Sequence, residues 1–217
     1  MHKINMSNNI FIKTHKISMF DQIIVLPNSL VIMDIDQTII TYQLYLNNSD
    51  WWNHTYNSYL NTLQNKQLAH DNTLKDIHNH ILTNDPIMID KDGFDLLFKR
   101  IQDNQSKLIF LTARDEYLRS TTFKGLQTCQ IDVDPNDIHH SMFKGKKIIE
   151  ILNQNLSYSN LVFVDDYSHN IKDVELELNK YLNLIKSTDT VQLTELNQLT
   201  NIDLFDITHD ILNIKTI

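Results

Sequence analysis

Apolar residues along this chain form short continuous runs that alternate with stretches of helical spacing. The runs predict strands at 30–34, 107–111, 131–133, 161–164 and 181–185, with a short extended piece near residue 11. Helical spacing covers 91–104, 115–127, 146–156 and 169–178. Strands buried on both faces read as continuous apolar runs, and strands that alternate with helices indicate a parallel sheet. We therefore expect an α/β fold with a Rossmann-like, doubly wound parallel sheet.

Residues 41–90 interrupt this alternation, because their only strand-like run is at 87–89. Their other apolar residues have helical spacing, with Tyr56, Leu60 and Leu63 on one face and Leu74, Ile77 and Ile81 on another. The predicted helix caps are Asp50 for the first helix and Asn72 or Thr73 for the second. We expect residues 1–40 and 91–217 to form the core, with 41–90 as a small helical cap insert. The tail from Thr190 onward has a weak helical pattern.

Composition argues against several classes of protein. The net charge of −8 and the lack of a basic stripe argue against a nucleic-acid binder. No apolar run is long enough to span a bilayer, and residues 1–16 lack the apolar centre of a signal peptide. The single cysteine, Cys129, is expected to be a buried structural thiol. These features predict a cytoplasmic protein without a nucleic-acid partner.

Two of the apolar runs end in pairs of carboxylates. Asp34 and Asp36 follow the first run, and Asp165 and Asp166 follow the run at 161–164. Ligands of open α/β sheets bind outside the carboxyl ends of the strands, so we expect both pairs to converge on one crevice. Carboxylates that lie close together need a hard cation, and oxygen ligands suit Mg²⁺.

The strand ends also supply the groups that phosphoryl transfer needs. A carboxylate such as Asp34 can attack phosphorus and form an aspartyl-phosphate. Asp36 lies two residues further on an extended chain and so points to the same side, where it can protonate a leaving oxygen and later deprotonate water. Thr112 can bind one phosphate oxygen, and a lysine near residue 144 can neutralise phosphate charge.

The ordered set resembles the four motifs of the haloacid dehalogenase-like superfamily. The matching segments are Asp34-Ile35-Asp36-Gln37-Thr38, the strand 108–111 ending at Thr112, Phe143-Lys144-Gly145, and Val162-Phe163-Val164-Asp165-Asp166. The resemblance implies a Mg²⁺-dependent phosphatase in which the insert at 41–90 is a helical C1-type cap. Asp34 would be the nucleophile and a metal ligand, and Asp36 the general acid and base and a ligand through its backbone carbonyl. Thr112, Ala113 and Lys144 would hold the phosphate, Asp166 would bind Mg²⁺ directly, and Asp165 would act through water.

A closer likeness concerns segments 46–52 and 111–126. They resemble a branch found in intracellular bacteria and poxviruses, which is catalogued as a domain of unknown function. Some Legionella effectors with this core are similar phosphotyrosine phosphatases. The likeness implies a phosphoprotein substrate, phosphotyrosine first, and an effector that acts inside a host cell. Trp51, Trp52 or Tyr56 would then stack on the phenyl ring.

Several alternatives stand beside these roles. Lys146 and Lys147 compete with Lys144 as the phosphate lysine, and Asp173 is a candidate partner for that lysine. Arg114 is expected in a surface ion pair, with a phosphate contact as the alternative. Trp51 and Trp52 fit a cap core as well as an aromatic wall. His139 and His140 are expected in a loop that holds no zinc.

Other functions also use this set of residues. A nucleotide or sugar phosphatase, a phosphotransferase and a catalytically silent binding module would share the fold. A response-regulator type of phosphate receiver has an acidic pair before its phosphorylated aspartate, whereas here the Asp-x-Asp segment comes first. The order of the motifs therefore favours the phosphatase.

Overall fold

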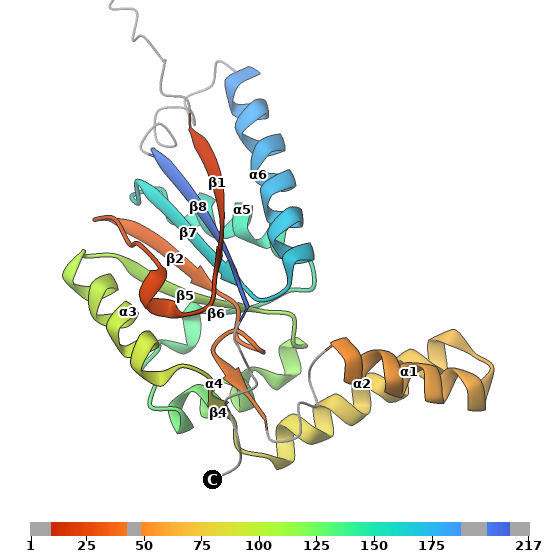
Figure 1. Ribbon diagram of the computed structural model, residues 1–217. Helices are drawn as coiled ribbons and strands as arrows, with labels where there is room; N and C mark the ends of the chain where they lie inside the picture. Colours follow the sequence, from red (N-terminus) through yellow and green to blue (C-terminus); the bar gives the residue numbers. More distant parts are fainter. Residues whose placement is uncertain (1–9, 43–48, 188–198, 209–217) are drawn as a thin grey trace, which may run out of the picture. The chain divides into compact units, whose positions relative to one another are not determined.

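The computed structural model describes residues 10–42, 49–187 and 199–208. Its main element is a six-stranded parallel sheet with strand order β1-β8-β7-β2-β5-β6, flanked by helices (Figure 1). The expected α/β class with a Rossmann-like, doubly wound sheet is thus confirmed. Contacts divide the chain into two compact units, residues 1–33, 92–109 and 143–217 in the first, and 34–91 and 110–142 in the second.

The elements have the following bounds. The strands of the sheet are β1 (Phe11–Ile17), β2 (Ser29–Met33), β5 (Lys107–Thr112), β6 (Ile138–His140), β7 (Asn160–Asp165) and β8 (Asn201–Ile207). The helices are α1 (Ser49–Leu63), α2 (Lys66–Thr83), α3 (Lys91–Asp103), α4 (Arg119–Thr128), α5 (Lys144–Gln154) and α6 (Ser168–Ser187). Short elements are the 3₁₀ turns η1 (Phe20–Gln22), η2 (Glu116–Leu118) and η3 (Pro135–Asp137), and a ribbon of β3 (Ile40–Thr41) with β4 (Ile87–Met88).

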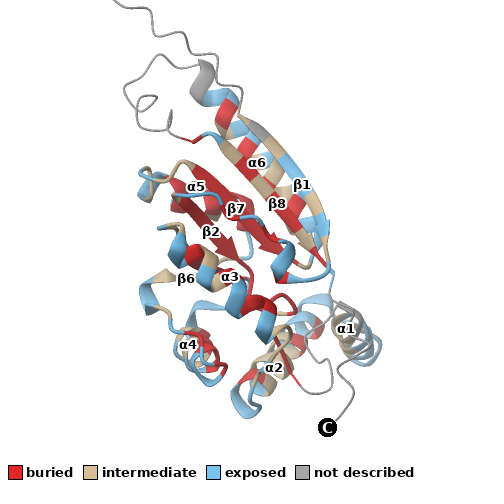
Figure 2. Ribbon diagram, turned by 60° about the vertical axis from the view of Figure 1, so that its left-hand side comes forward, coloured by how far each residue is buried: buried red, intermediate tan, exposed pale blue. Residues whose placement is uncertain are grey.

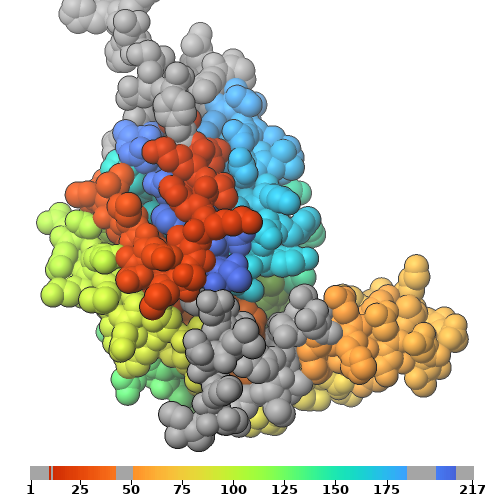
Figure 3. All heavy atoms as spheres, viewed as in Figure 1, coloured from red at the N-terminus to blue at the C-terminus, as the bar shows by residue number. Residues whose placement is uncertain are grey.

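The first unit is built on strands that are buried along their length. Every residue of β2 and β7 is buried, as the continuous apolar runs predict (Figure 2). β1 pairs with β8 in parallel, so segments from the two ends of the chain lie side by side (Figure 3). α6 packs against α5 and over β7 and β8. Phe94 of α3 meets Phe20 edge to face, with ring centroids 5.8 Å apart.

The second unit contains the predicted helical insert. α1 and α2 pack side by side, and the antiparallel β3–β4 ribbon joins the two ends of the insert, with Ile40 opposite Met88 (Figure 1). Tyr42, Ile81 and Leu118 form a buried apolar cluster, and Ile77 packs against it. This cluster ties α2 to the segment that follows β5.

The predicted caps of the insert helices are wrong. α1 begins at Ser49, so Asp50 lies inside the helix. α2 begins at Lys66, because the side chain of Asn65 accepts a hydrogen bond from the backbone N–H of Leu68 at 3.1 Å and so acts as the N-cap. Asn72 and Thr73 therefore lie within α2.

Three strand assignments also need correction. Residues 131–133 form no strand, and the edge strand is β6, which holds His139 and His140 instead of a loop. Residues 181–185 belong to α6. The tail expected to be helical contains β8, which pairs with β7 and β1; the rest of that tail, 190–198 and 209–217, lies outside the described residues.

The structure also bears on the state of Cys129 and on the expectation that no segment spans a membrane. Cys129 is buried and its thiol lies 3.8 Å from the carbonyl of Pro86, and burial raises the pKa of the thiol. Within residues 10–42, 49–187 and 199–208, none of the helices combines the length and the apolar character needed to cross a membrane.

Candidate functional site

The segment after β2 folds into a tight turn. The backbone N–H groups of Ile39 and Ile40 both donate to the carbonyl of Ile35 at 3.0 Å, and Gln37 has a positive φ of 59°. Left-handed backbone costs a residue with a β-carbon roughly 1–2 kcal/mol, which the surrounding turn must offset. The turn brings the hydroxyl of Thr38 back to donate to Asp34 Oδ2 at 3.2 Å, and Asp34 is 4% exposed. The Asp-x-Asp-x-Thr segment is therefore a locally organised unit.

Strand register relates this segment to the second acidic pair. Met33 is opposite Val164 in the parallel β2–β7 pair. Asp34 and Asp165 are the residues that directly follow these two, so each belongs to the carboxyl end of one of two neighbouring strands. In the first unit, a carboxylate oxygen of Asp165 lies within 4.8 Å of a carboxylate oxygen of Asp166.

Asp165 is a fully buried carboxylate with several hydrogen-bond donors. Lys144 Nζ lies 2.7 Å from its Oδ2, and the backbone N–H of Tyr167 donates to its Oδ1 at 2.9 Å. The amide of Asn170 donates to both oxygens at 3.0 and 3.1 Å. Asp165 thus links β7, the start of α5 and the first turn of α6.

The structure distinguishes the three candidate lysines by burial. Lys144 is 2% exposed and pairs with the buried Asp165. Lys146 is exposed, with its Nζ 5.8 Å from the centre of the Phe143 ring. Lys147 is partly exposed and pairs with Glu150 on the surface of the same helix. Lys144 is therefore the lysine that the fold places beside a predicted site carboxylate.

Gly145 explains why a glycine follows Lys144. A β-carbon at this position would lie 2.8 Å from the backbone oxygen of Asp173 and 2.8 Å from Cγ of Glu177, both on α6. Asp173 Oδ2 accepts a hydrogen bond from the backbone N–H of Gly145 at 2.9 Å. Asp173 thus contacts the first turn of α5, next to the lysine that it was expected to assist.

Arg114 corrects an expectation, because it is buried instead of lying in a surface pair. Its Nε and Nη2 donate to Asp36 Oδ2 and Oδ1 at 2.8 Å each, and the side chains are 3% and 24% exposed. The remaining guanidinium contacts are to the hydroxyls of Tyr42 at 2.9 Å and Thr122 at 3.2 Å. Burial by itself would lower the pKa of Arg114, but the charge of Asp36 outweighs it and the pKa is raised.

Thr112 and Ala113 lie directly beside this pair. The hydroxyl of Thr112 donates to Asp36 Oδ2 at 3.3 Å and accepts from the backbone N–H of Arg114 at 3.2 Å, and Thr112 is fully buried. Ala113 is exposed and lines a cavity. The second unit therefore gathers Asp36, Thr112 and Ala113, three of the predicted site residues.

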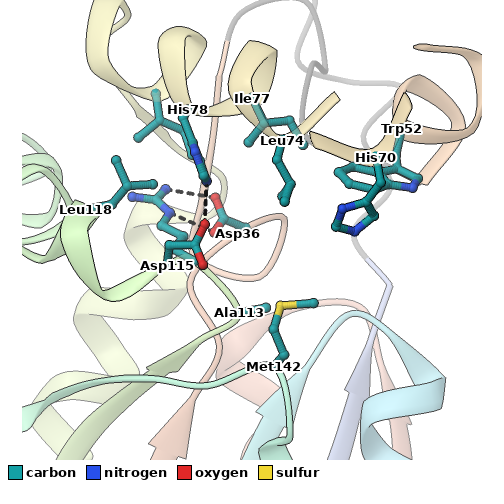
Figure 4. A pocket seen from close by; sticks show the side chains of 12 residues that line it. Asp36, Trp52, His70, Leu74, Ile77, His78, Ala113, Asp115, Leu118 and Met142 are labelled. Carbon is teal, nitrogen blue, oxygen red and sulfur yellow. Dashed lines mark hydrogen bonds and ion pairs between the residues drawn. The ribbon is translucent and has the colours of Figure 1, made fainter. Parts of the chain in front are cut away.

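A cavity of about 440 Å³ opens next to Asp36, entirely within the second unit (Figure 4). α2 contributes Leu74, Ile77 and His78, and α1 contributes Trp52, whose ring lies edge to face with that of His70 at a centroid distance of 5.4 Å. Ala113, Asp115 and Met142 line the side that faces α2 in Figure 4. Trp52 thus lines the cavity, whereas Trp51 is half-buried and does not.

His78 joins the insert to the segment after β5, a link that the sequence analysis missed. Its Nε2 lies 3.0 Å from Asp115 Oδ2, and its Nδ1 meets the hydroxyl of Tyr117. A neutral imidazole satisfies both partners, since Nε2–H donates to the carboxylate and Nδ1 accepts from the phenol. Burial lowers the pKa of His78, and Asp115 offsets part of this effect.

Three partly buried histidines predict how stability depends on pH. Burial lowers the pKa of His78, His80 and His140 below the ordinary value of 6.5. The unfolded chain then binds protons more readily than the folded one, so the free energy of unfolding should be highest above about pH 6.5 and fall as the pH drops through the folded pKa values. Urea unfolding at pH 7.5 and pH 5.0 measures this difference.

His140 gives the sharpest test of this pH dependence. Its Nδ1 lies 3.1 Å from the Arg114 carbonyl, and its Nε2 is buried without a hydrogen-bond partner among the described residues. His140→Gln should therefore reduce the loss of stability at pH 5.0, whereas His54→Gln, at an exposed position of α1, should leave it unchanged. Equal pH dependence in all three proteins would refute the assignment.

Comparison with known families identifies the chain. It belongs to the DUF2608 family, a protein family of unknown function, whose model matches residues 13–143. The matched region covers most of β1, the turn with Asp34, the helical insert and the strands β5 and β6, and it ends one residue before Lys144. No curated protein matches the chain.

Proposed function

We propose that this protein hydrolyses phosphomonoesters through an aspartyl-phosphate formed on Asp34. The observation that carries the proposal is the buried Lys144–Asp165 pair at the carboxyl end of β7. β2 is the neighbouring strand, and Asp34 directly follows its last residue, Met33, which is opposite Val164. A buried ion pair is expensive to maintain unless both charges are well satisfied, so it marks a candidate functional site. The motif order along the chain supports the same reading.

The proposed reaction has two steps. An oxygen of Asp34 attacks phosphorus, and the bond from phosphorus to the leaving oxygen breaks. Water then attacks the phosphoryl group, which restores the carboxylate of Asp34 and releases inorganic phosphate. Asp36 is the group that exchanges protons with the leaving oxygen and with the water, while Thr112, Ala113 and Lys144 hold the phosphate oxygens.

The carboxylates suit Mg²⁺, which would neutralise phosphate charge when bound. Asp165 already accepts hydrogen bonds from Lys144, the Tyr167 backbone and Asn170, so we assign it a role through water. Asp166, which is partly exposed, and Asp34 are the proposed direct carboxylate ligands, with the backbone carbonyl of Asp36.

The cavity favours an aromatic leaving group. Its walls are mainly apolar, and Trp52 with His70 offers an aromatic surface in the same cavity that Asp36 lines. We therefore propose a phosphotyrosine protein as substrate, in line with the host-cell setting implied by the resemblance to secreted effectors. A nucleotide or sugar phosphatase is the second candidate, because the same reacting groups would serve it.

One assay series tests this function. The purified protein should hydrolyse p-nitrophenyl phosphate with added Mg²⁺ and lose that activity in EDTA. Among natural classes, phosphotyrosine peptides should have a higher kcat/KM than phosphoserine peptides, nucleotides or sugar phosphates. Full activity after metal removal would refute the mechanism, and a hundredfold preference for a small metabolite would refute the substrate class.

Two tryptophans provide a matched pair for the same series. Trp52→Leu should raise KM for a phosphotyrosine peptide, because Trp52 lines the cavity, whereas Trp51→Leu should change it little. Equal effects of the two substitutions on KM would mean that the phenyl ring of the substrate does not bind in the cavity.

A further inference from the structure

The charged residues around the cavity set what it can accept. The cavity is lined by two carboxylates, those of Asp36 and Asp115, and by one guanidinium, that of Arg114. A neutral His78 satisfies both of its partners, Asp115 and Tyr117, and burial lowers its pKa. The described lining therefore carries more negative than positive charge.

The guanidinium of Arg114 is already engaged. Two of its N–H groups bind Asp36 at 2.8 Å, and others bind Tyr42 at 2.9 Å and Thr122 at 3.2 Å. A ligand anion would have to displace Asp36 or a buried hydroxyl to reach it. Breaking a buried, hydrogen-bonded pair is costly, so Arg114 is a poor receptor for a second anionic group.

Asp115 is the charge that an incoming ligand would meet. Its side chain is 48% exposed, it lines the cavity, and one oxygen accepts from His78. Figure 4 shows it on the cavity wall opposite Leu74 and next to Asp36. The apolar walls nearby, including Trp52, Leu74 and Met142, offer contact area without a charge preference.

We propose that this cavity binds a phenolic ring whose attached groups are uncharged or cationic, and that Asp115 is a specificity-determining residue that disfavours acidic groups. The catalytic consequence rests on the proposed function. Phosphotyrosine flanked by lysine or arginine should then be a better substrate than phosphotyrosine flanked by glutamate or aspartate. Substrates with a second phosphate should be poor for the same electrostatic reason.

Binding can be tested without any turnover. The probes are p-cresol, tyramine and 4-hydroxyphenylacetate, which share a phenol ring and carry a neutral, a cationic and an anionic group. The chain has two tryptophans, so the indole N–H signal of Trp52 in an ¹⁵N spectrum can be assigned by Trp52→Leu and followed during titration. Tyramine and p-cresol should shift this signal, and 4-hydroxyphenylacetate should bind several-fold more weakly than either.

Asp115→Asn isolates the charge. Asparagine keeps an oxygen that accepts from His78, so the arrangement of α2 should persist. The affinities for tyramine and 4-hydroxyphenylacetate should each change by roughly fivefold and in opposite directions, the size expected for one unit charge a few ångströms away in a solvent-exposed site, so their ratio should fall by more than either change alone. Asp85→Asn, at an exposed position just after α2, is the matched control and should leave the ratio unchanged.

The outcomes separate this inference from the phosphatase proposal. Equal affinity for the cation and the anion, or an unchanged ratio in a folded Asp115→Asn, overturns the charge selection. Binding of p-cresol to Trp52→Leu that is as tight as to the wild-type protein, measured by calorimetry, overturns the ring site. Ring binding with the expected charge preference but no Asp34-dependent hydrolysis of any phosphomonoester supports the site and overturns the phosphatase. If the protein hydrolyses phosphotyrosine peptides, Asp115→Asn should also reduce the ratio of kcat/KM for peptides with basic flanking residues to kcat/KM for peptides with acidic ones.

Discussion

Replacing Asp34 by asparagine should abolish phosphomonoester hydrolysis, lowering kcat for p-nitrophenyl phosphate by about 10³-fold or more. The amide cannot act as the attacking carboxylate, so the aspartyl-phosphate cannot form. Asparagine has nearly the same volume and keeps an oxygen that accepts from Thr38, which lies 3.2 Å from Asp34 Oδ2. The loss should therefore appear in kcat at an almost unchanged melting temperature.

A matched control makes this result specific. Asp85→Asn removes one exposed carboxylate from the same unit and should keep full activity. Both variants are to be purified side by side, because a contaminating phosphatase would give equal rates in each. An Asp34→Asn protein that retains a tenth of the wild-type rate would rule out Asp34 as the nucleophile.

The sequence located the central strands because burial on both faces leaves a clear signal. β2, β5 and β7 are apolar runs that stop at polar residues, and the predicted ends agree with the structure to within one residue. The helical character of the insert was also predicted, since its helical spacing continues over several turns, but the start of α2 was missed. Long patterns of this kind are determined by local sequence and by burial together.

Shorter patterns failed for identifiable reasons. The run at 181–185 fits a strand or one face of a helix, and α6 extends through it because Val174, Leu178 and Leu182 continue one buried stripe. β6 has three residues, two of them histidines, so it lacks an apolar signal. β8 has strand-like alternation only in part, with Leu204 and Phe205 adjacent and both buried.

The site residues show the same limit. Asp34, Asp36 and Asp165 could be proposed because each follows a recognisable run. The burial of Arg114 could not, since it depends on the tertiary placement of Tyr42, 72 residues away along the chain, and of Thr122 on α4. The cavity likewise requires α1 and α2 to be placed against the segment after β5, which no local pattern encodes.

Replacing Lys144 by methionine should reduce the free energy of unfolding by about 3–5 kcal/mol. Lys144 Nζ lies 2.7 Å from Asp165 Oδ2, and the side chains are 2% and 0% exposed. Methionine fills most of the same space, but it leaves the Asp165 carboxylate buried without its cation. Because small domains are stable by only about 5–15 kcal/mol, the loss should be evident in urea unfolding and in melting temperature.

Lys147→Met in the same helix is the matched control for this change. Lys147 pairs with Glu150 at the same distance of 2.7 Å, but these side chains are 28% and 60% exposed. Solvent screens such a pair, so its removal should cost no more than about 1 kcal/mol. The double variant Lys144→Met with Asp165→Asn should regain part of the stability, since it removes the buried charge that the single change leaves unpaired. If Lys144→Met and Lys147→Met unfold alike, the buried pair does not hold α5 to β7, and the observation on which the proposed function rests loses its force.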